Sequence, residues 1–146
     1  MPNSTDQRPR GITALAIFFT AGAFISATSC ASLLSPGSPL ELMWRLNPRA
    51  RGAFVSMGSL GPILLGVVSA ACALAAPGLL RGRSWGYWLA VGLLSVNLLG
   101  DVVNVGLGTE PRALAGVPIV TAVLVFLATE RVRRFFRRGA GLWGSR

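Results

Sequence analysis

The chain has 146 residues, of which 52% are hydrophobic and 13% are charged, and its mean hydropathy of +0.59 is too high for an ordinary soluble domain. Its 14 basic residues are all arginines and outnumber the acidic residues, which gives a net charge of +9. These arginines form short clusters between long apolar runs, so the pattern indicates a membrane protein and argues against a soluble nucleic-acid-binding protein. The expected partner of the arginines is the anionic surface of the membrane.

The first apolar segment, residues 11–34, contains no charged side chain. It is long enough to cross the bilayer as one helix, which needs about 20 residues. A signal peptide has a shorter apolar region of about 7–15 residues, so we expect this helix to remain in the mature protein. Residues 35–51 then form the longest connection, which is polar enough to leave the hydrocarbon. Within it, residues 40–46 can form a short helix at the interface, anchored by Trp44.

The second expected span covers residues 52–80 and is again free of charge. It is longer than a straight crossing requires, and Pro62 is the natural position for a kink because proline removes a helical hydrogen bond. Close packing at small residues holds membrane helices together, so we expect the first two helices to pack along rows of small residues. These rows are Gly22, Ser26 and Cys30 on the first helix and Gly58, Pro62, Gly66 and Ala70 on the second.

The two cysteines, Cys30 and Cys72, are expected at different depths in the membrane. At a rise of about 1.5 Å per residue, their depths differ by roughly 16 Å. A disulfide requires Cα atoms within about 7 Å of each other, so we expect both residues to be small packing residues instead.

A short basic turn, residues 81–84, leads into an aromatic cluster that is typical of a helix end at the headgroup level. The cluster consists of Trp85, Tyr87 and Trp88. The third span follows at residues 85–107, and the fourth and shortest span at residues 113–129. A basic tail, residues 130–146, completes a single membrane domain.

The arginines are distributed unevenly between the two sides of the membrane. Ten of them lie in the N-terminal segment, the loop between the second and third spans and the tail, whereas four lie in the other two loops. The positive-inside rule therefore places both termini in the cytoplasm and the longest loop outside. We expect an all-α, four-transmembrane-helix bundle with a short interfacial segment in its first outer loop.

The third span carries three polar side chains at intervals of four and three residues, which places them on one face of the helix. They are Asn97, Asp101 and Asn104. A carboxylate in the hydrocarbon costs about 2.5–3.5 kcal/mol on insertion scales. We therefore expect Asp101 to face protein or water.

Four roles are open for Asp101. In a structural role, it accepts hydrogen bonds from the neighbouring asparagines and pairs with an outer-loop arginine, either Arg45 or Arg49. In a transport role, it binds and releases a proton, or coordinates a cation together with the asparagine amides. It can also act as a general base, although no second catalytic group is evident, or contact a partner subunit.

The first part of the tail combines arginines with aromatic residues and indicates a basic helix that lies on the inner leaflet. Its residues are Arg131, Arg133, Arg134, Phe135, Phe136, Arg137 and Arg138. Nucleic acid or a soluble acidic protein is the alternative partner of this segment, and we favour the anionic lipid surface.

The composition also excludes several chemistries. The chain has no histidine, so it lacks the imidazole required for histidine zinc sites, His-ligated haem and Ser-His catalysis. No glycine-rich phosphate-binding loop is set between a strand and a helix. We therefore expect no catalytic residue, no metal, no cofactor and no enzymatic activity.

Three short sequences, at residues 43–48, 85–91 and 97–104, resemble those of small uncharacterised bacterial integral membrane proteins with four transmembrane helices. The resemblance covers nearly the whole chain, supports the four-helix topology in a bacterial inner membrane and carries no activity. The favoured function is therefore non-catalytic, as an accessory or scaffold subunit of a larger membrane complex or as a self-associating protein. The alternative is a small proton, cation or solute transporter that acts as an oligomer through Asp101.

Overall fold

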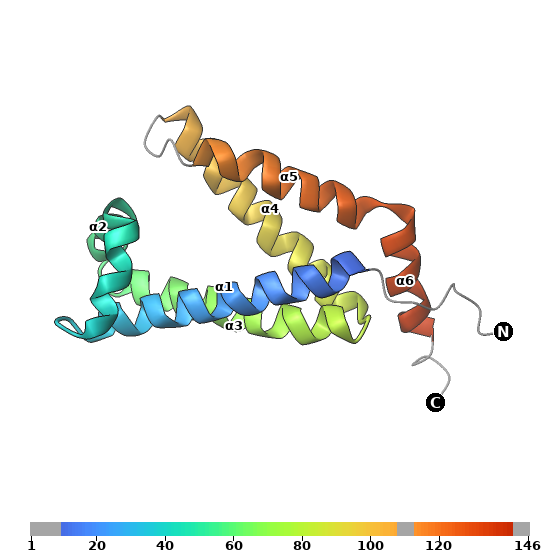
Figure 1. The fold of residues 1–146 in the computed structure, drawn as a ribbon, viewed down its shortest axis with the longest axis horizontal. Coiled ribbons are helices and arrows are strands. Elements are labelled where there is room, and N and C mark those ends of the chain that lie inside the picture. Colours follow the sequence, from blue (N-terminus) through green and yellow to red (C-terminus); the bar gives the residue numbers. More distant parts are fainter. Residues whose placement is uncertain (1–9, 108–112, 142–146) are drawn as a thin grey trace. The chain divides into compact units, whose positions relative to one another are not determined.

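The computed structural model describes residues 10–107 and 113–141 (Figure 1). All regular structure within these two ranges is helical. The elements are α1 (Arg10–Leu34), the 3-10 helix η1 (Pro39–Leu46), α2 (Pro48–Ser56), α3 (Leu60–Leu80), α4 (Ser84–Gly106), α5 (Ala113–Ala128) and α6 (Glu130–Gly141). The prediction of an all-α protein is confirmed for this part of the chain.

Three helical segments are long and apolar enough to cross a membrane, namely Gly11–Leu34, Leu60–Leu80 and Ser84–Gly106. These segments are compatible with a multi-pass membrane protein. A fourth apolar helical segment, Gly116–Ala128, is shorter. The whole of α5 has 16 residues and therefore extends about 24 Å, against about 30 Å of hydrocarbon. A crossing by α5 requires local thinning of the bilayer or help from flanking residues.

The chain divides into two compact units. The first unit, Ile17–Leu74, contains most of α1, then η1, α2 and most of α3. The second unit contains the described residues on either side of that range, and thus α4, α5 and α6 together with the first part of α1 and the end of α3. We call them the loop unit and the hairpin unit.

Within the loop unit, α1 and α3 pack against each other in antiparallel order along the predicted rows of small residues. The Ser69 hydroxyl of α3 donates a hydrogen bond to the Ala23 carbonyl of α1 at 2.9 Å. Two turns further along α1, the Cys30 thiol donates a hydrogen bond to the Pro62 carbonyl of α3 at 3.2 Å. Both cysteines are free, and Cys72 packs beside Gly22 of α1. The two cysteines therefore serve as small packing residues at different levels of the helix pair.

The second helix of the chain begins later than the sequence suggests. Instead of one helix over residues 52–80, α2 ends at Ser56 and α3 begins at Leu60. Gly58 lies between them with φ +58°, a left-handed conformation that glycine adopts without strain and that ends α2. Pro62 consequently lies in the first turn of α3, where its missing N–H leaves no helical hydrogen bond unmade, and it does not kink a longer helix.

The 3-10 helix η1 is held on α1 by Trp44. The indole Nε1 of Trp44 donates a hydrogen bond to the Ser32 hydroxyl at 2.6 Å, and that hydroxyl donates to the Ser29 carbonyl at 2.9 Å. The Trp44 ring also packs against Phe54 of α2, with ring centroids 6.1 Å apart. Only 8% of the surface of Trp44 is exposed, and its N–H has a buried partner inside the protein, whereas the sequence predicts this side chain as an anchor at the membrane interface.

Within the hairpin unit, α3 and α4 are joined by a tight turn around Gly82. The Arg83 amide donates to the Gly78 carbonyl at 3.0 Å, and the Gly82 amide donates to the Leu79 carbonyl at 3.1 Å. This pattern, with Gly82 at φ +64°, is a Schellman motif, which terminates α3 and satisfies its last carbonyl groups. The turn sends the chain directly into α4.

The remaining helices of the hairpin unit pack around the start of α4. Helix α5 packs against α4, and α6 bends away from α5 and contacts both (Figure 1). The Tyr87 hydroxyl of α4 donates to the Leu127 carbonyl at the end of α5 at 3.2 Å. Fully or almost fully buried apolar residues of this unit include Ile12, Leu79, Ala90, Leu127, Val132 and Phe136. The core of the hairpin unit therefore lies near the 81–83 turn.

Candidate functional site

The polar residues predicted on the third span do share one stretch of α4. The Asn97 amide nitrogen Nδ2 donates to the Asp101 carboxylate oxygen Oδ2 at 3.2 Å, one helical turn away. Asn97 and Asn104 are exposed, and Asp101 between them is half-buried. The helix therefore places an amide and a carboxyl group in direct contact on one face.

The carboxylate of Asp101 lies against α5 at Gly116. A Cβ atom added to Gly116 would lie 2.6 Å from Oδ2 and 3.3 Å from Cγ of Asp101. Any larger residue at position 116 would occupy the space that the carboxylate now fills. Asp101 is thus placed by two helices, since α4 supplies the side chain and its asparagine donor, and α5 supplies the room.

Sequence reasoning missed Gly116. It is the only glycine between residues 113 and 128, and it lies on the helix that follows α4 across a short connection. A lone glycine on this helix is a signal for close packing, but the sequence alone does not show which residue of α5 faces Asp101.

The predicted ion pair of Asp101 with Arg45 or Arg49 joins residues of different units, and it stays a prediction. The loop unit contains an ion pair that was not predicted, between Arg51 of α2 and Glu41 of η1, with Nη2 and Oε1 2.6 Å apart. Both side chains are partly exposed, and such a pair contributes about 0–1 kcal/mol. It links η1 to α2 beside the Trp44–Phe54 contact.

A second cluster of predicted residues lies at the other end of the hairpin unit. Helix α6 turns its apolar side toward the protein, so that Val132 is 1% and Phe136 is 3% exposed. The Phe136 ring packs on the Tyr87 ring with centroids 5.2 Å apart, and the half-buried Phe135 ring lies over the backbone of Gly82. Phe135 therefore contacts the α3–α4 turn and Phe136 contacts α4, whereas the sequence predicts both rings at the lipid surface.

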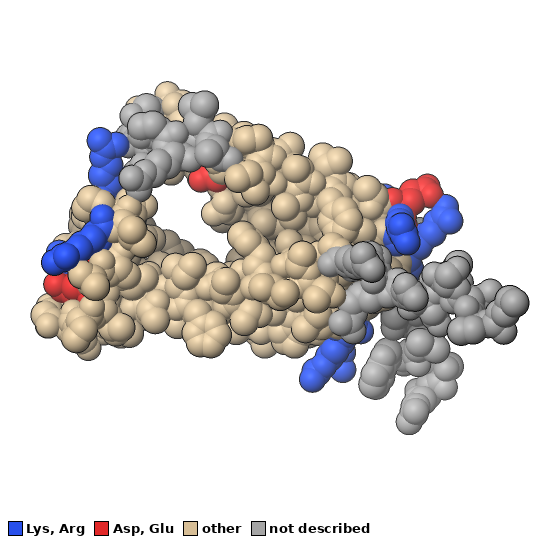
Figure 2. Space-filling view, viewed as in Figure 1, with Lys and Arg blue, Asp and Glu red and all other residues tan. Residues whose placement is uncertain are grey.

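The arginines around this cluster face outward. Arg81 and Arg83 of the turn and Arg131, Arg133 and Arg134 of α6 are exposed, and Figure 2 shows basic side chains gathered at this end of the chain. Arg134 forms an ion pair with Glu130 one turn earlier in α6. The side chains of Arg137 and Arg138 lie outside the described ones.

The aromatic residues at the start of α4 divide into two kinds. Trp85 and Trp88 are 44% and 68% exposed, which suits side chains at the headgroup level. Tyr87 is half-buried, because its ring packs on Phe136 and its hydroxyl is bonded to α5. Trp85 and Trp88 stay predicted interface anchors, whereas Tyr87 joins α4 to α5 and α6.

The chemistry available at the α4 face is that of a carboxyl group with an amide donor. Among the described residues, no group of three or more histidine, cysteine, aspartate or glutamate side chains is placed to hold a metal ion. The face can bind a proton or accept and donate hydrogen bonds to another polar group. Comparison of the chain with protein-family models, with curated proteins and with solved structures finds no match in any of the three.

Proposed function

We propose that the protein is a non-catalytic, multi-pass membrane protein that associates with other transmembrane helices through α4, as a scaffold or accessory subunit of a membrane complex or with copies of itself. The observation that carries this proposal is the contact between Asn97 and Asp101 on a helix long enough to span the membrane. Only 11% of the most apolar stretch of that helix is buried. Polar groups and uncovered helix surface thus occur together on α4.

The physical reason lies in the bilayer. Hydrocarbon offers no hydrogen-bond partner, so an amide and a carboxyl group favour contact with another helix. The exposed apolar side chains Val96 and Val103, which are next to Asn97 and Asn104 in the sequence, supply surface for close packing. Each interhelical polar contact contributes about 0.6–2 kcal/mol, and burial of Asp101 against protein also avoids the cost of placing it in lipid.

The proposal includes a topology of four crossings with both termini in the cytoplasm. The packing of Phe135 over Gly82 supports it, because α6 contacts the 81–83 turn and two segments in contact are expected on the same side of the membrane. Both segments are rich in arginine, as the positive-inside rule requires for a cytoplasmic side. The short helix α5 is then the fourth crossing.

The contact of Asp101 with Gly116 favours a second function, the transport of a proton or a small cation by an oligomer. Carboxyl groups on membrane-spanning helices are typical of ion pathways and proton relays, and Gly116 and Asn97 give this one room and a hydrogen-bond donor. In this role the Asp101 carboxyl group carries the proton or cation, and Asn97 orients it through its hydrogen bond. Loss of ion flux in proteoliposomes of Asp101→Asn, with unchanged oligomeric state, would favour transport over association.

Association can be tested by purifying the full-length protein in a mild detergent and measuring which chains remain bound and in what ratio. We expect Asn97→Leu to weaken association about three- to thirty-fold, because it removes a polar contact and disturbs Asp101. Ser95→Leu is the matched control, since Ser95 is exposed on the opposite side of α4. A wild-type chain that purifies alone as a monomer, in detergent and in nanodiscs, would refute the proposal.

A further inference from the structure

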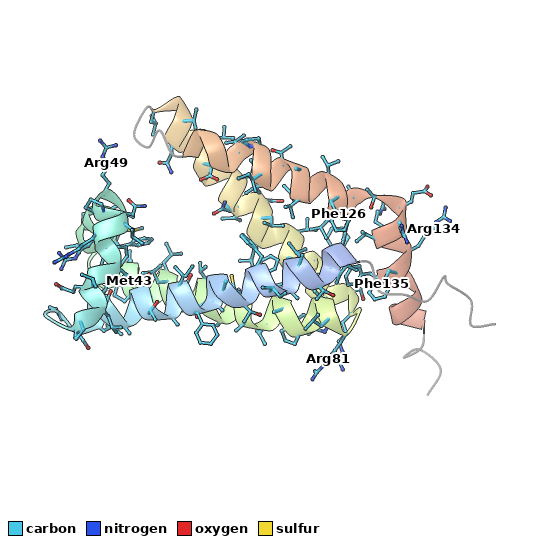
Figure 3. All side chains as sticks on the ribbon, in the orientation of Figure 1. Met43, Arg49, Arg81, Phe126, Arg134 and Phe135 are labelled. Atoms are coloured by element: carbon cyan, nitrogen blue, oxygen red, sulfur yellow. The ribbon has the colours of Figure 1, made fainter. Side chains whose placement is uncertain are left out.

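Helix α6 has a strongly two-sided sequence, and the structure uses its apolar side internally. Val132 and Phe136 are almost fully buried, and Phe136 packs on both Tyr87 and Phe135, with ring centroids 5.2 Å apart in each case. Phe135 covers Gly82, where an added Cβ would lie 3.1 Å from the ring. In Figure 3, Phe135 points toward the helices and Arg134 points away from them. An amphipathic helix that binds lipid by insertion needs its apolar side free, and here that side is occupied.

The outward side of α6 and the turn beneath it form one basic surface, which we call the basic end. Its exposed members are Arg81, Arg83, Arg131, Arg133 and Arg134. The two groups of arginines lie far apart in sequence and are brought together by the contact of Phe135 with Gly82. Glu130 is the only acidic side chain in α6, and it neutralises part of this charge through Arg134.

The position of the basic end along the membrane normal indicates what binds it. Trp85 and Trp88 follow the 81–83 turn directly and are exposed at the start of α4. Exposed tryptophans at the end of a spanning helix lie at the headgroup level, so the neighbouring arginines lie at the level of the lipid phosphates. A phosphate at that level accepts hydrogen bonds from guanidinium groups in their preferred geometry.

We propose that the basic end binds the headgroups of anionic phospholipids by charge and hydrogen bonding alone, while Phe135 and Phe136 remain packed in the protein. Helix α6 then acts as a rigid support for arginines at the inner leaflet and does not enter the lipid. Its affinity for anionic lipid falls steeply with salt, because no buried apolar surface adds to the electrostatic attraction. This inference rests on the proposed membrane topology and is independent of the association through α4.

The test is a lipid-selectivity measurement on the reconstituted full-length protein. Electron spin resonance of spin-labelled phosphatidylglycerol and phosphatidylcholine gives the ratio of their association constants. We expect a preference for phosphatidylglycerol of about tenfold at low ionic strength. The preference should approach unity as salt rises from about 0.1 M to about 1 M, where the screening length falls from about 10 Å to about 3 Å.

Charge variants define the site. Replacement of Arg131, Arg133 and Arg134 together by glutamine should abolish most of the preference, and replacement of the same three by lysine should retain it in part. Arg45→Gln with Arg49→Gln is the matched control, because it removes positive charge from the loop unit. Circular dichroism and gel filtration establish that each variant is folded.

Three outcomes would overturn the proposal. Equal association of the two lipids with the wild-type chain at low salt would show that the basic end has no site for anionic headgroups. A preference that survives at high salt and is lost in the Phe135→Leu/Phe136→Leu variant would show that the phenylalanines insert into lipid. Tighter binding of a short single-stranded RNA than of phosphatidylglycerol by the same three arginines would assign the surface to nucleic acid.

Discussion

Gly78 of α3 and Gly86 of α4 bring two helix backbones into direct contact, since a Cβ atom added to Gly86 would lie 2.6 Å from the Cα atom of Gly78. A methyl group at this distance would overlap with Gly78, and the overlapping atoms belong to the backbone, which cannot rotate away as a side chain can. The contact sits beside the Schellman turn that ends α3, so the turn and the two glycines together define the helical hairpin. The packing of α6 depends on this hairpin, because Tyr87 and Gly82, which contact Phe136 and Phe135 of α6, both belong to it.

We expect Gly86→Ala to destabilise the protein by about 1–3 kcal/mol, because the added methyl group forces the two backbones apart. Gly92→Ala is the control on the same helix, since nothing lies within 4 Å of a Cβ atom there. That control should be neutral or stabilising by about 0.5–1 kcal/mol, as alanine favours helix over glycine. Unfolding in mixed micelles, followed by circular dichroism, measures both. Equal stability of the two variants would contradict the close contact.

The packing of α1 on α3 predicts a size limit at Gly66. A Cβ atom there would lie 4.0 Å from the Cys30 sulfur, which is ordinary contact distance, so Gly66→Ala should be tolerated. Gly66→Leu should separate the helices and break the hydrogen bond from Cys30 to the Pro62 carbonyl. The Cys30 thiol should then react faster with a maleimide reagent than in the wild type and in the alanine variant. Identical reaction rates in all three chains would argue against this helix pair.

Trp44→Phe should cost about 0.5–1.5 kcal/mol, because it removes the hydrogen bond to the Ser32 hydroxyl while most of the ring packing stays. Trp88→Phe is the matched control, since Trp88 is 68% exposed. Limited proteolysis of residues 35–51 reports the release of η1 from α1. Faster cleavage in the Trp44 variant alone is the expected result, and equal cleavage rates would place Trp44 outside the protein interior.

Gly116→Ala should displace the Asp101 carboxylate from α5, because the new methyl group would overlap with Oδ2. We expect a loss of stability of about 1–3 kcal/mol, and Gly116→Ala/Asp101→Ala should recover much of it because the conflict disappears. Gly106→Ala on α4, where nothing lies within 4 Å, is the control. A double variant no more stable than the single one would mean that Asp101 and position 116 do not interact.

The proposed topology predicts that both chain ends label from the cytoplasmic side. With Cys30 and Cys72 replaced by alanine, single cysteines are introduced at Ser4, Ser38 and Gly144. A membrane-impermeant maleimide applied to intact spheroplasts should modify position 38 only, and inverted vesicles should expose positions 4 and 144. Opposite labelling of positions 4 and 144 would require an odd number of crossings and would remove α5 from the membrane.

The helical content of the chain follows from sequence alone. Runs such as residues 11–34 have no charge, and a backbone in hydrocarbon must satisfy its own hydrogen bonds, which a helix does within one segment. The turn at residues 81–84 also follows from the sequence, because a short basic stretch separates two apolar runs. The start of α3 did not follow in this way, because a left-handed Gly58 ends α2, and apolar composition on both sides of it masks the break.

The direction of individual side chains required the tertiary structure. The sequence shows that aromatic residues such as Trp44, Phe135 and Phe136 are suited to a membrane interface. It does not show which surface each side chain contacts. Contacts between distant residues decide this, namely Trp44 with Ser32, Phe136 with Tyr87 and Asp101 with Gly116. The sequence by itself determined where helices form, because hydrogen bonding within a helix is local. Only the packing of one helix on another determined which of its faces are left for lipid or for a partner.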